Sequence, residues 1–189
     1  MHYCCLVITR EFPSDQVLEK ALAPYNEDLF YENKDDGKEY PVFMWDWWKI
    51  GGRYTGQFKL KVEKDCEKYG WKFYSREPRA GRLFRSLALE NIRRLAEKTG
   101  SVLMHREEDY YGSMGFNDDF LYVDGGLIKD ISNYLEAGCF CFVDADGHAE
   151  TRSYYDGKSF TDDPEFEEKL KAALSASEDF YVCTVDLHD

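Results

Sequence analysis

Two mainly apolar runs of strand length lie near the two ends of the chain. Residues 3–9 read YCCLVIT, and residues 180–187 read FYVCTVDL. A strand that is apolar on both of its faces is stable only where both faces are covered, so such runs are typical of central strands. We therefore expect both runs to lie in the middle of one sheet, although almost the whole chain separates them.

Other segments are predicted to be helical. They are residues 14–23, 81–99, 127–136 and 164–174. Ser14 is a suitable N-cap for the first, and the second has the strongest apolar stripe. Short strands lie between them, several of them typical of hairpins. We predict a single α+β domain over residues 1–189, with a mainly antiparallel sheet flanked by about four helices; residues 65–135 would elaborate it.

Residues 45–56 (WDWWKIGGRYTG) contain three of the four tryptophans, followed by a double glycine and an arginine. In an extended segment Trp45 and Trp47 point to one side and Asp46 to the other. We expect Trp45 and Trp47 to be largely buried. The segment would then form a wall of aromatic rings next to a carboxylate.

The double glycine, Gly51 and Gly52, permits positive φ angles and a close approach to the backbone. Arg53 follows directly, and we expect it to pair with Asp46 or Asp186, because a buried arginine needs a partner. Two interpretations fit these residues. The segment is either a pocket for a nucleotide or another flat anion, or a tryptophan-rich corner of the core held by an ion pair.

The same stretch resembles the motif W-D-W-[WY]-x-[IV]-G-G-R-W-x-G of a family of small proteins encoded by bacteriophages and prophages. Residues 21–28 (ALAPYNED) and 184–189 (TVDLHD) are also similar to sequences of that family. The resemblance implies that the first strand, the tryptophan segment and the last strand meet in space. It does not extend to residues 65–135. The matched positions are Asn26, Glu27, Trp45, Asp46, Trp47, Gly51, Gly52, Arg53, Gly56, Asp186 and His188.

Asp186 and His188 are two positions apart on a predicted strand, so they share a face. An acid and a histidine beside an arginine can perform acid–base chemistry, or hold a phosphate or a metal ion. One hypothesis is thus a site that binds or hydrolyses a nucleotide-like molecule. Trp45 and Trp47 would stack on it, and Arg53 would hold its phosphate. The simpler alternative is that Asp186 and His188 are structural.

The net charge of −13, from 37 acidic and 24 basic residues, disfavours direct contact with nucleic acid or anionic membranes. Such a surface suits a basic partner, or serves solubility alone. The resemblance implies an accessory protein that acts by binding, as an anti-CRISPR-like inhibitor of a host defence protein, such as a nuclease. Acids and aromatic residues alternate in a predicted loop, which we expect to dock on this partner. Its contacting residues would be Glu107, Glu108, Asp109, Tyr110, Tyr111, Phe116, Asp118 and Asp119.

Familiar catalytic signatures are missing, including the phosphate-binding P-loop, because residues 51–56 (GGRYTG) lack its lysine. A zinc site from Cys139, Cys141 and His148 has poor spacing, so we expect neither a metal nor a cofactor. No stretch approaches the roughly 20 apolar residues of a membrane span. The N-terminus lacks the pattern of a signal peptide. We therefore expect a protein of the host cytoplasm with reduced cysteines.

Overall fold

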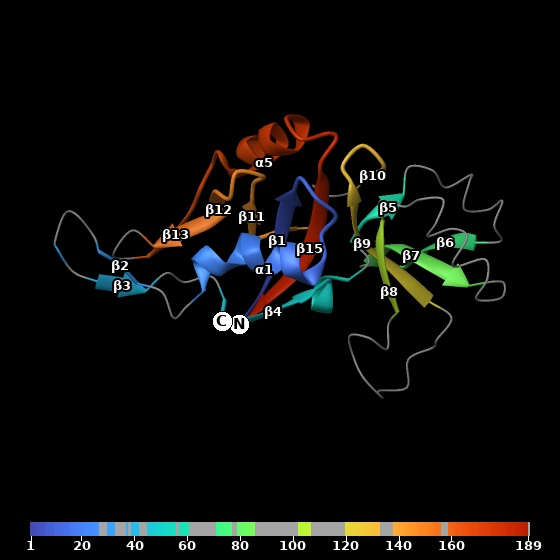
Figure 1. The fold of residues 1–189 in the computed structure, drawn as a ribbon, viewed down its shortest axis with the longest axis horizontal. Helices are drawn as coiled ribbons and strands as arrows, with labels where there is room; N and C mark the ends of the chain where they lie inside the picture. Colours follow the sequence, from blue (N-terminus) through green and yellow to red (C-terminus); the bar gives the residue numbers. More distant parts are fainter. Residues whose placement is uncertain are drawn as a thin grey trace.

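A nine-stranded sheet forms the centre of the protein in a computed structural model (Figure 1). The structure describes residues 1–26, 30–32, 37, 39–41, 45–55, 57–60, 71–76, 79–85, 102–106, 120–132, 138–155 and 159–188. In spatial order the strands are β12 (Ala149–Thr151), β11 (Cys141–Val143), β1 (His2–Thr9), β15 (Tyr181–His188), β9 (Phe120–Leu127), β7 (Arg79–Arg85) and β6 (Trp71–Arg76). Two further strands extend this path: β4 (Trp47–Ile50) pairs with β15, and β8 (Leu103–Arg106) pairs with β9.

The first and last apolar runs lie side by side in the middle of this sheet, as predicted. β1 and β15 pair antiparallel over their full length, from His2 opposite His188 to Thr9 opposite Tyr181. The other edge of β1 pairs in parallel with β11. The other edge of β15 pairs with two strands, β9 along its first half and β4 along its second. The first strand, the tryptophan segment and the last strand therefore do meet in space.

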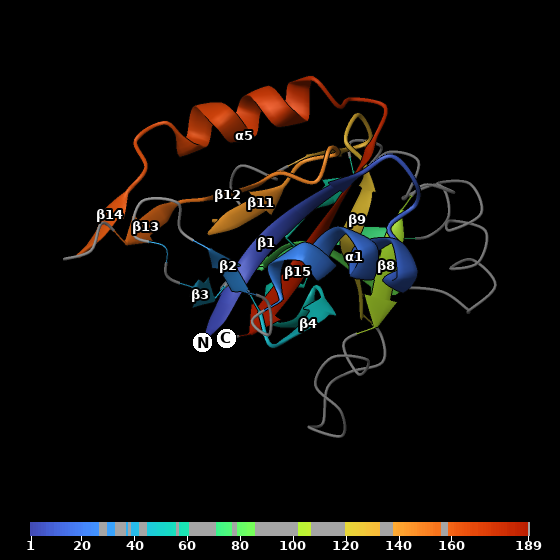
Figure 2. The same ribbon diagram turned by 60° about the vertical axis from the view of Figure 1, so that its left-hand side comes forward.

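Both faces of the central strands are covered, which explains why their sequences are mainly apolar. Helix α1 (Asp15–Leu22) packs on one face, where Leu18 and Leu22 join a buried cluster with Val7 and Val185. Helix α5 (Phe166–Ser175) packs on the other face, against a second buried cluster. Figure 2 shows the two helices on different sides of β1 and β15. Burying one such leucine stabilises the fold by about 1.5–3 kcal/mol.

Small two-stranded sheets complete the described part of the chain. They pair β2 (Phe30–Glu32) with β3 (Glu39–Pro41), β5 (Lys59–Leu60) with β10 (Ile131–Ser132), and β13 (Ser153–Tyr155) with β14 (Phe160–Asp162). Single 3₁₀ turns occur at Ala23–Tyr25 and Gly52–Tyr54. None of the helices that the structure describes is long and apolar enough to cross a membrane.

The prediction of about four flanking helices is wrong, because the described residues contain two α-helices. α1 begins as expected after Ser14, whose hydroxyl accepts a hydrogen bond from the backbone of Val17 at 3.4 Å. The start of the helix predicted over 81–99 is instead strand β7, which pairs with β6 on one edge and β9 on the other. Backbone pairing on both edges overrides a local helical pattern. Residues 86–100 lie outside the described part of the chain.

The helix predicted over 127–136 is also not formed in its described part, residues 127–132. Leu127 ends β9, and the chain turns at once into β10. β9 is held there by β15, since Leu127 lies opposite Tyr181. The pairing partner in space, which is remote in sequence, decides the conformation at this point. Residues 133–137 are outside the described residues.

Candidate functional site

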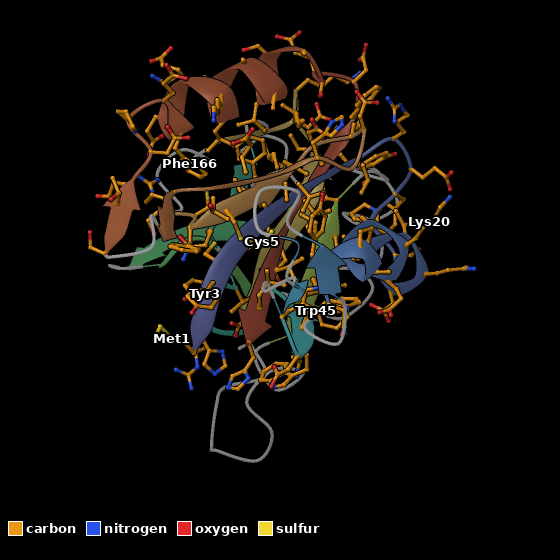
Figure 3. The ribbon with its side chains drawn as sticks, turned by 90° about the vertical axis from the view of Figure 1, so that its left-hand side faces the viewer. Met1, Tyr3, Cys5, Lys20, Trp45 and Phe166 are labelled. Carbon is orange, nitrogen blue, oxygen red and sulfur yellow. The ribbon has the colours of Figure 1, made fainter. Side chains whose placement is uncertain are left out.

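Three aromatic side chains form a row across the end of the sheet where β1 begins and β15 finishes. His2 lies opposite His188 in the β1–β15 pairing, and His188 lies opposite Trp47 in the β15–β4 pairing. Residues directly opposite on neighbouring strands project from the same face of a sheet. Met1 and Tyr3 mark this end of β1 in Figure 3, and Trp45 marks the segment that leads into β4.

The three rings are in mutual contact. The indole of Trp47 stacks on the imidazole of His188, with ring centroids 5.1 Å apart and an interplanar angle of 12°. The His2 ring is steeply inclined to both, with its centroid 4.8 Å from that of His188 and 5.5 Å from that of Trp47, at interplanar angles of 75° and 78°. Each imidazole is therefore held by ring contacts as well as by its own strand.

Each histidine also contacts a carboxylate through the same ring nitrogen. Nδ1 of His188 lies 2.8 Å from Asp46 Oδ1, and Nδ1 of His2 lies 2.9 Å from Asp186 Oδ1. We refer to His2, Asp46, Trp47, Asp186 and His188 as the histidine cluster. A carboxylate on Nδ1 fixes the orientation of the ring and leaves Nε2 as the nitrogen that can bind or exchange a proton.

Asp46 is held in place by β15 as well as by its own turn. Its backbone N–H donates to the carbonyl of His188 at 2.8 Å, and its Oδ1 accepts the N–H of Trp47 at 2.6 Å. Partial desolvation raises the pKa of Asp46, but the hydrogen bonds from His188 and the Trp47 amide outweigh it. The net pKa lies below the usual value, which favours the charged carboxylate opposite His188.

Asp186 lies deeper than Asp46. Its side chain is 3% exposed, whereas that of Asp46 is 33% exposed. Besides its contact with His2, Asp186 accepts the backbone N–H of Arg53 through Oδ2 at 2.9 Å. Both of its oxygens are thus hydrogen-bonded, as a buried carboxylate requires.

The double glycine explains how the chain passes so close to this carboxylate. Gly51 and Gly52 have φ angles of 63° and 50°. A Cβ atom on Gly52 would lie 2.4 Å from Cβ of Asp186, and one on Gly51 would lie 2.6 Å from a carboxylate oxygen of buried Asp124. Only glycine fits between two buried carboxylates in this backbone conformation. Thr55, just after the turn, donates its hydroxyl to Asp124 at 2.8 Å.

The two tryptophans expected to be buried together have different surroundings. Trp45 is buried, and its Nε1–H donates to the carbonyl of Leu22 at 3.0 Å. Trp47 is 44% exposed, so the prediction is wrong for this residue. The chain bends at Asp46 before β4 begins, so the alternation of an extended segment does not relate residues 45 and 47.

The predicted ion pair of Arg53 with Asp46 or Asp186 is not formed. Its side chain is exposed and has no ion pair within the part of the chain that the structure describes. The backbone N–H takes the place of the guanidinium as the partner of Asp186. Arg53 is nevertheless anchored through its backbone beside the histidine cluster, and its charged side chain is exposed.

Asp186 and His188 share a face, as expected, but they do not pair with each other. Each takes its partner from another strand or turn, so the site contains two carboxylate–histidine pairs where the sequence suggested one. Sequence reasoning missed His2. Its signal was indirect: if the first and last runs pair antiparallel from end to end, residue 2 falls opposite residue 188.

Other predicted positions contribute less to this geometry. Asn26 forms an isolated parallel β-bridge with Trp45. Glu27, Gly56 and the predicted docking residues within 107–120 lie outside the described residues, apart from the backbone of Phe120 in β9. Cys139 and Cys141 belong to the two different buried clusters.

A cleft of about 640 Å³ lies elsewhere, beside α1 and the turn after β11. Arg10 spans it by donating to the carbonyl of Ala145 and to Asp146, and Asp144 accepts the backbone N–H groups of its own turn. These polar groups satisfy one another, so they hold two loops together. The histidine cluster is the stronger candidate, because its Nε2 atoms have no hydrogen-bond partner within the described part of the chain and the indole of Trp47 is exposed.

Comparison with models of known protein families, with curated proteins and with solved structures found no match. Function therefore has to be inferred from the side-chain geometry.

Proposed function

We propose that the histidine cluster binds a small, flat, phosphate-bearing molecule of the nucleotide type and hydrolyses it. The observation that carries this proposal is the exposure of Trp47. One side of its indole rests on His188, while 44% of the residue remains open to solvent. An exposed indole held rigidly in this way is a platform for another planar ring, and stacking of a base on an aromatic side chain contributes about 1–3 kcal/mol.

The groups around the platform suit the rest of such a ligand. Arg53 leaves the turn that is bound to Asp186, and an arginine side chain binds phosphate oxygens through two parallel hydrogen bonds. His188 is oriented by Asp46, the arrangement that prepares an imidazole to accept or donate a proton during a reaction. Stacking, anion binding and proton transfer thus meet at one end of the sheet.

Adenosine monophosphate is a suitable probe, with binding followed by calorimetry and by quenching of tryptophan fluorescence. We expect Trp47→Leu to weaken binding by about 10-fold or more, which corresponds to the loss of one base stack. Trp48→Leu is the matched control, because Trp48 lies on the opposite face of β4, where its Nε1–H donates to Glu19 of α1. It should lower stability while leaving the affinity of the folded protein unchanged.

Either of two results would contradict this proposal. One is the absence of any binding of adenosine monophosphate to the parent protein. The other is a folded Trp47→Leu variant that binds as well as the parent. A loss that is equal in both tryptophan variants would indicate an effect of folding rather than of stacking.

A second candidate function is supported by the net charge of −13. In this proposal the protein is a phage or prophage accessory protein in the host cytoplasm. The acidic, tyrosine-rich segment over 107–120, which is predicted from the sequence to be a loop, would dock on the basic channel of a host defence nuclease. Binding would then weaken steeply with added salt, and would be lost when the five loop acids are neutralised. Trp47→Leu would leave this binding to the nuclease intact. In the first proposal, by contrast, the variant with the five acids neutralised binds adenosine monophosphate normally.

A further inference from the structure

The histidine cluster contains a second carboxylate-oriented imidazole that the proposed function does not use. We propose that His2 is a catalytic residue and that it complements His188, one imidazole accepting a proton while the other donates one. This inference rests on the proposed function and assigns its reaction class, the hydrolysis of a phosphate ester. It also assigns Asp186 as the positioning residue of His2.

The first support is the equivalence of the two pairs. In each pair Nδ1 contacts a carboxylate oxygen, at 2.9 Å for His2 and 2.8 Å for His188. Nε2 of both rings has no hydrogen-bond partner among the described residues. With ring centroids 4.8 Å apart, both imidazoles can reach one small ligand that lies on Trp47.

The second support is how firmly His2 is held. Asp186 is buried, its other oxygen binds the N–H of Arg53, and Gly52 is in close contact with its side chain. The carbonyl of His2 also accepts a hydrogen bond from the hydroxyl of Tyr54 at 2.9 Å. A reacting group must be held close to its productive geometry by its neighbours, and His2 meets this condition from both its backbone and its ring.

The reaction requires one proton to be removed and one to be supplied. A water molecule attacks phosphorus, and the bond between phosphorus and the leaving oxygen breaks. Nε2 of the neutral imidazole takes the proton of the water, and Nε2 of the imidazolium gives its proton to the leaving oxygen. The imidazoles exchange protonation states, and proton exchange with solvent restores them. Electrons and atoms balance without a further reactant.

Two nucleotide esters distinguish this role from a structural one. Thymidine 5′-phenyl phosphate has a leaving group that needs protonation, whereas the 4-nitrophenyl ester has one that leaves readily as an anion. We expect the proton donor to matter far more for the first ester, and the proton acceptor to matter for both. The readout is kcat/KM for each ester in the parent, His2→Asn, His188→Asn and His148→Asn proteins.

The asparagine variants are chosen so that the fold is retained. The side-chain amide of asparagine can donate to Asp186 much as Nδ1 does, but it has no counterpart of Nε2. We expect His2→Asn and His188→Asn each to lower kcat/KM for the phenyl ester by about 100-fold or more. For the 4-nitrophenyl ester, one of the two should lose much less. His148→Asn makes the same substitution at a carboxylate-paired histidine in the turn after β11, outside the histidine cluster, and should change neither value.

The outcomes separate the two proposals. His2 is not a proton-transfer residue if His2→Asn retains the parent kcat/KM within about twofold. The same conclusion follows if the losses of kcat/KM in His2→Asn and His188→Asn are equal for the phenyl ester and also equal for the 4-nitrophenyl ester. If adenosine monophosphate binds but neither ester is hydrolysed, the catalytic assignment fails and the binding proposal stands. If nothing binds to the parent, the proposed function itself fails.

A measurement on the parent protein tests the role of His2 even if a variant does not fold. Diethyl pyrocarbonate acylates accessible imidazole nitrogens, and peptide mass spectrometry identifies the modified residue. We expect adenosine monophosphate to protect both His2 and His188 of the parent protein, and to leave His148 reactive. Acylation of His2 at the same rate with and without the nucleotide would overturn its assignment.

Discussion

Similar carboxylate–histidine contacts occur in two regions of the protein. In one the paired residues are close in sequence, and in the other they are remote. In the turn after β11, Nδ1 of His148 lies 3.3 Å from Asp144 Oδ2, four residues away in sequence. In the histidine cluster, the paired residues are 184 and 142 positions apart. The side chain of His148 is 78% exposed and contacts no second histidine in the described part of the chain.

The difference lies in what each carboxylate is needed for. Asp144 accepts the backbone N–H groups of Asp146 and His148 at 2.9 Å, so it organises its own tight turn. Desolvation raises the pKa of Asp144, but these hydrogen bonds lower it by more, so the pKa is below its usual value, as it is at Asp46. A contact between close neighbours forms with the turn itself. Contacts between remote strands form only with the whole sheet, and they leave ring nitrogens in a shared space, which is what a binding site requires.

The largest predicted difference between the regions concerns their glycines. Gly52→Ala should destabilise the fold by roughly 4 kcal/mol or more, because the new methyl group overlaps Asp186 and the φ angle is positive. Gly147 also has a positive φ angle, of 87°, but no atom lies within 4 Å of its added Cβ. Gly147→Ala should therefore cost only about 1–2 kcal/mol. Urea denaturation of both variants measures the contrast, and equal losses would refute it.

Substitutions of the two carboxylates, Asp186 and Asp144, should differ less in their effect on stability. Asp186→Ala should lower the free energy of unfolding by roughly 3 kcal/mol, because it leaves the Arg53 amide and His2 without their buried partner. Asp144→Ala should cost about 1 kcal/mol, since solvent can replace most of its hydrogen bonds. Thermal melting tests this order, and an Asp144 variant that is the less stable of the two would reverse it.

Acid should affect the two regions alike. The pKa values of Asp46 and Asp144 are both lowered in the folded protein relative to the usual 3.8. A carboxyl whose folded pKa is depressed stabilises the fold above its unfolded pKa, and this stabilisation is lost as pH falls through the folded pKa. Below about pH 4 both contacts should weaken together. Carboxyl chemical shifts followed by NMR should give both groups pKa values below 3.8, and Asp46→Asn and Asp144→Asn should each reduce the stability lost in acid.

Central strands and capped helices could be read from the sequence because their signals are local. The apolar runs in β1 and β15 allow no face to be exposed, and Ser14 marks the start of α1. The strand β7 could not be read, because the residues that hold it lie in β6 and β9. A helical pattern within one segment carries no information about partners elsewhere.

The location of the site could be predicted from the sequence, but the arrangement of its side chains could not. The composition of residues 45–56 pointed to this end of the sheet, and Asp186 and His188 were placed on one face. The exposure of Trp47 depends on the bend at Asp46, which is fixed by a hydrogen bond to the carbonyl of His188. The role of His2 depends on pairing register, and a register between remote strands is set by the assembled sheet.

The pairing of β1 with β15 also has a consequence for biosynthesis. Joining residues so far apart in sequence requires closure of a very long loop, which slows folding. A ribosome adds about 5–20 residues per second, so β1 waits on the order of ten seconds before β15 exists. During that time β1 is an apolar strand without this partner on its edge, and such strands associate with other nascent chains. The yield of folded protein is therefore expected to depend on the chaperones that shield β1 during translation.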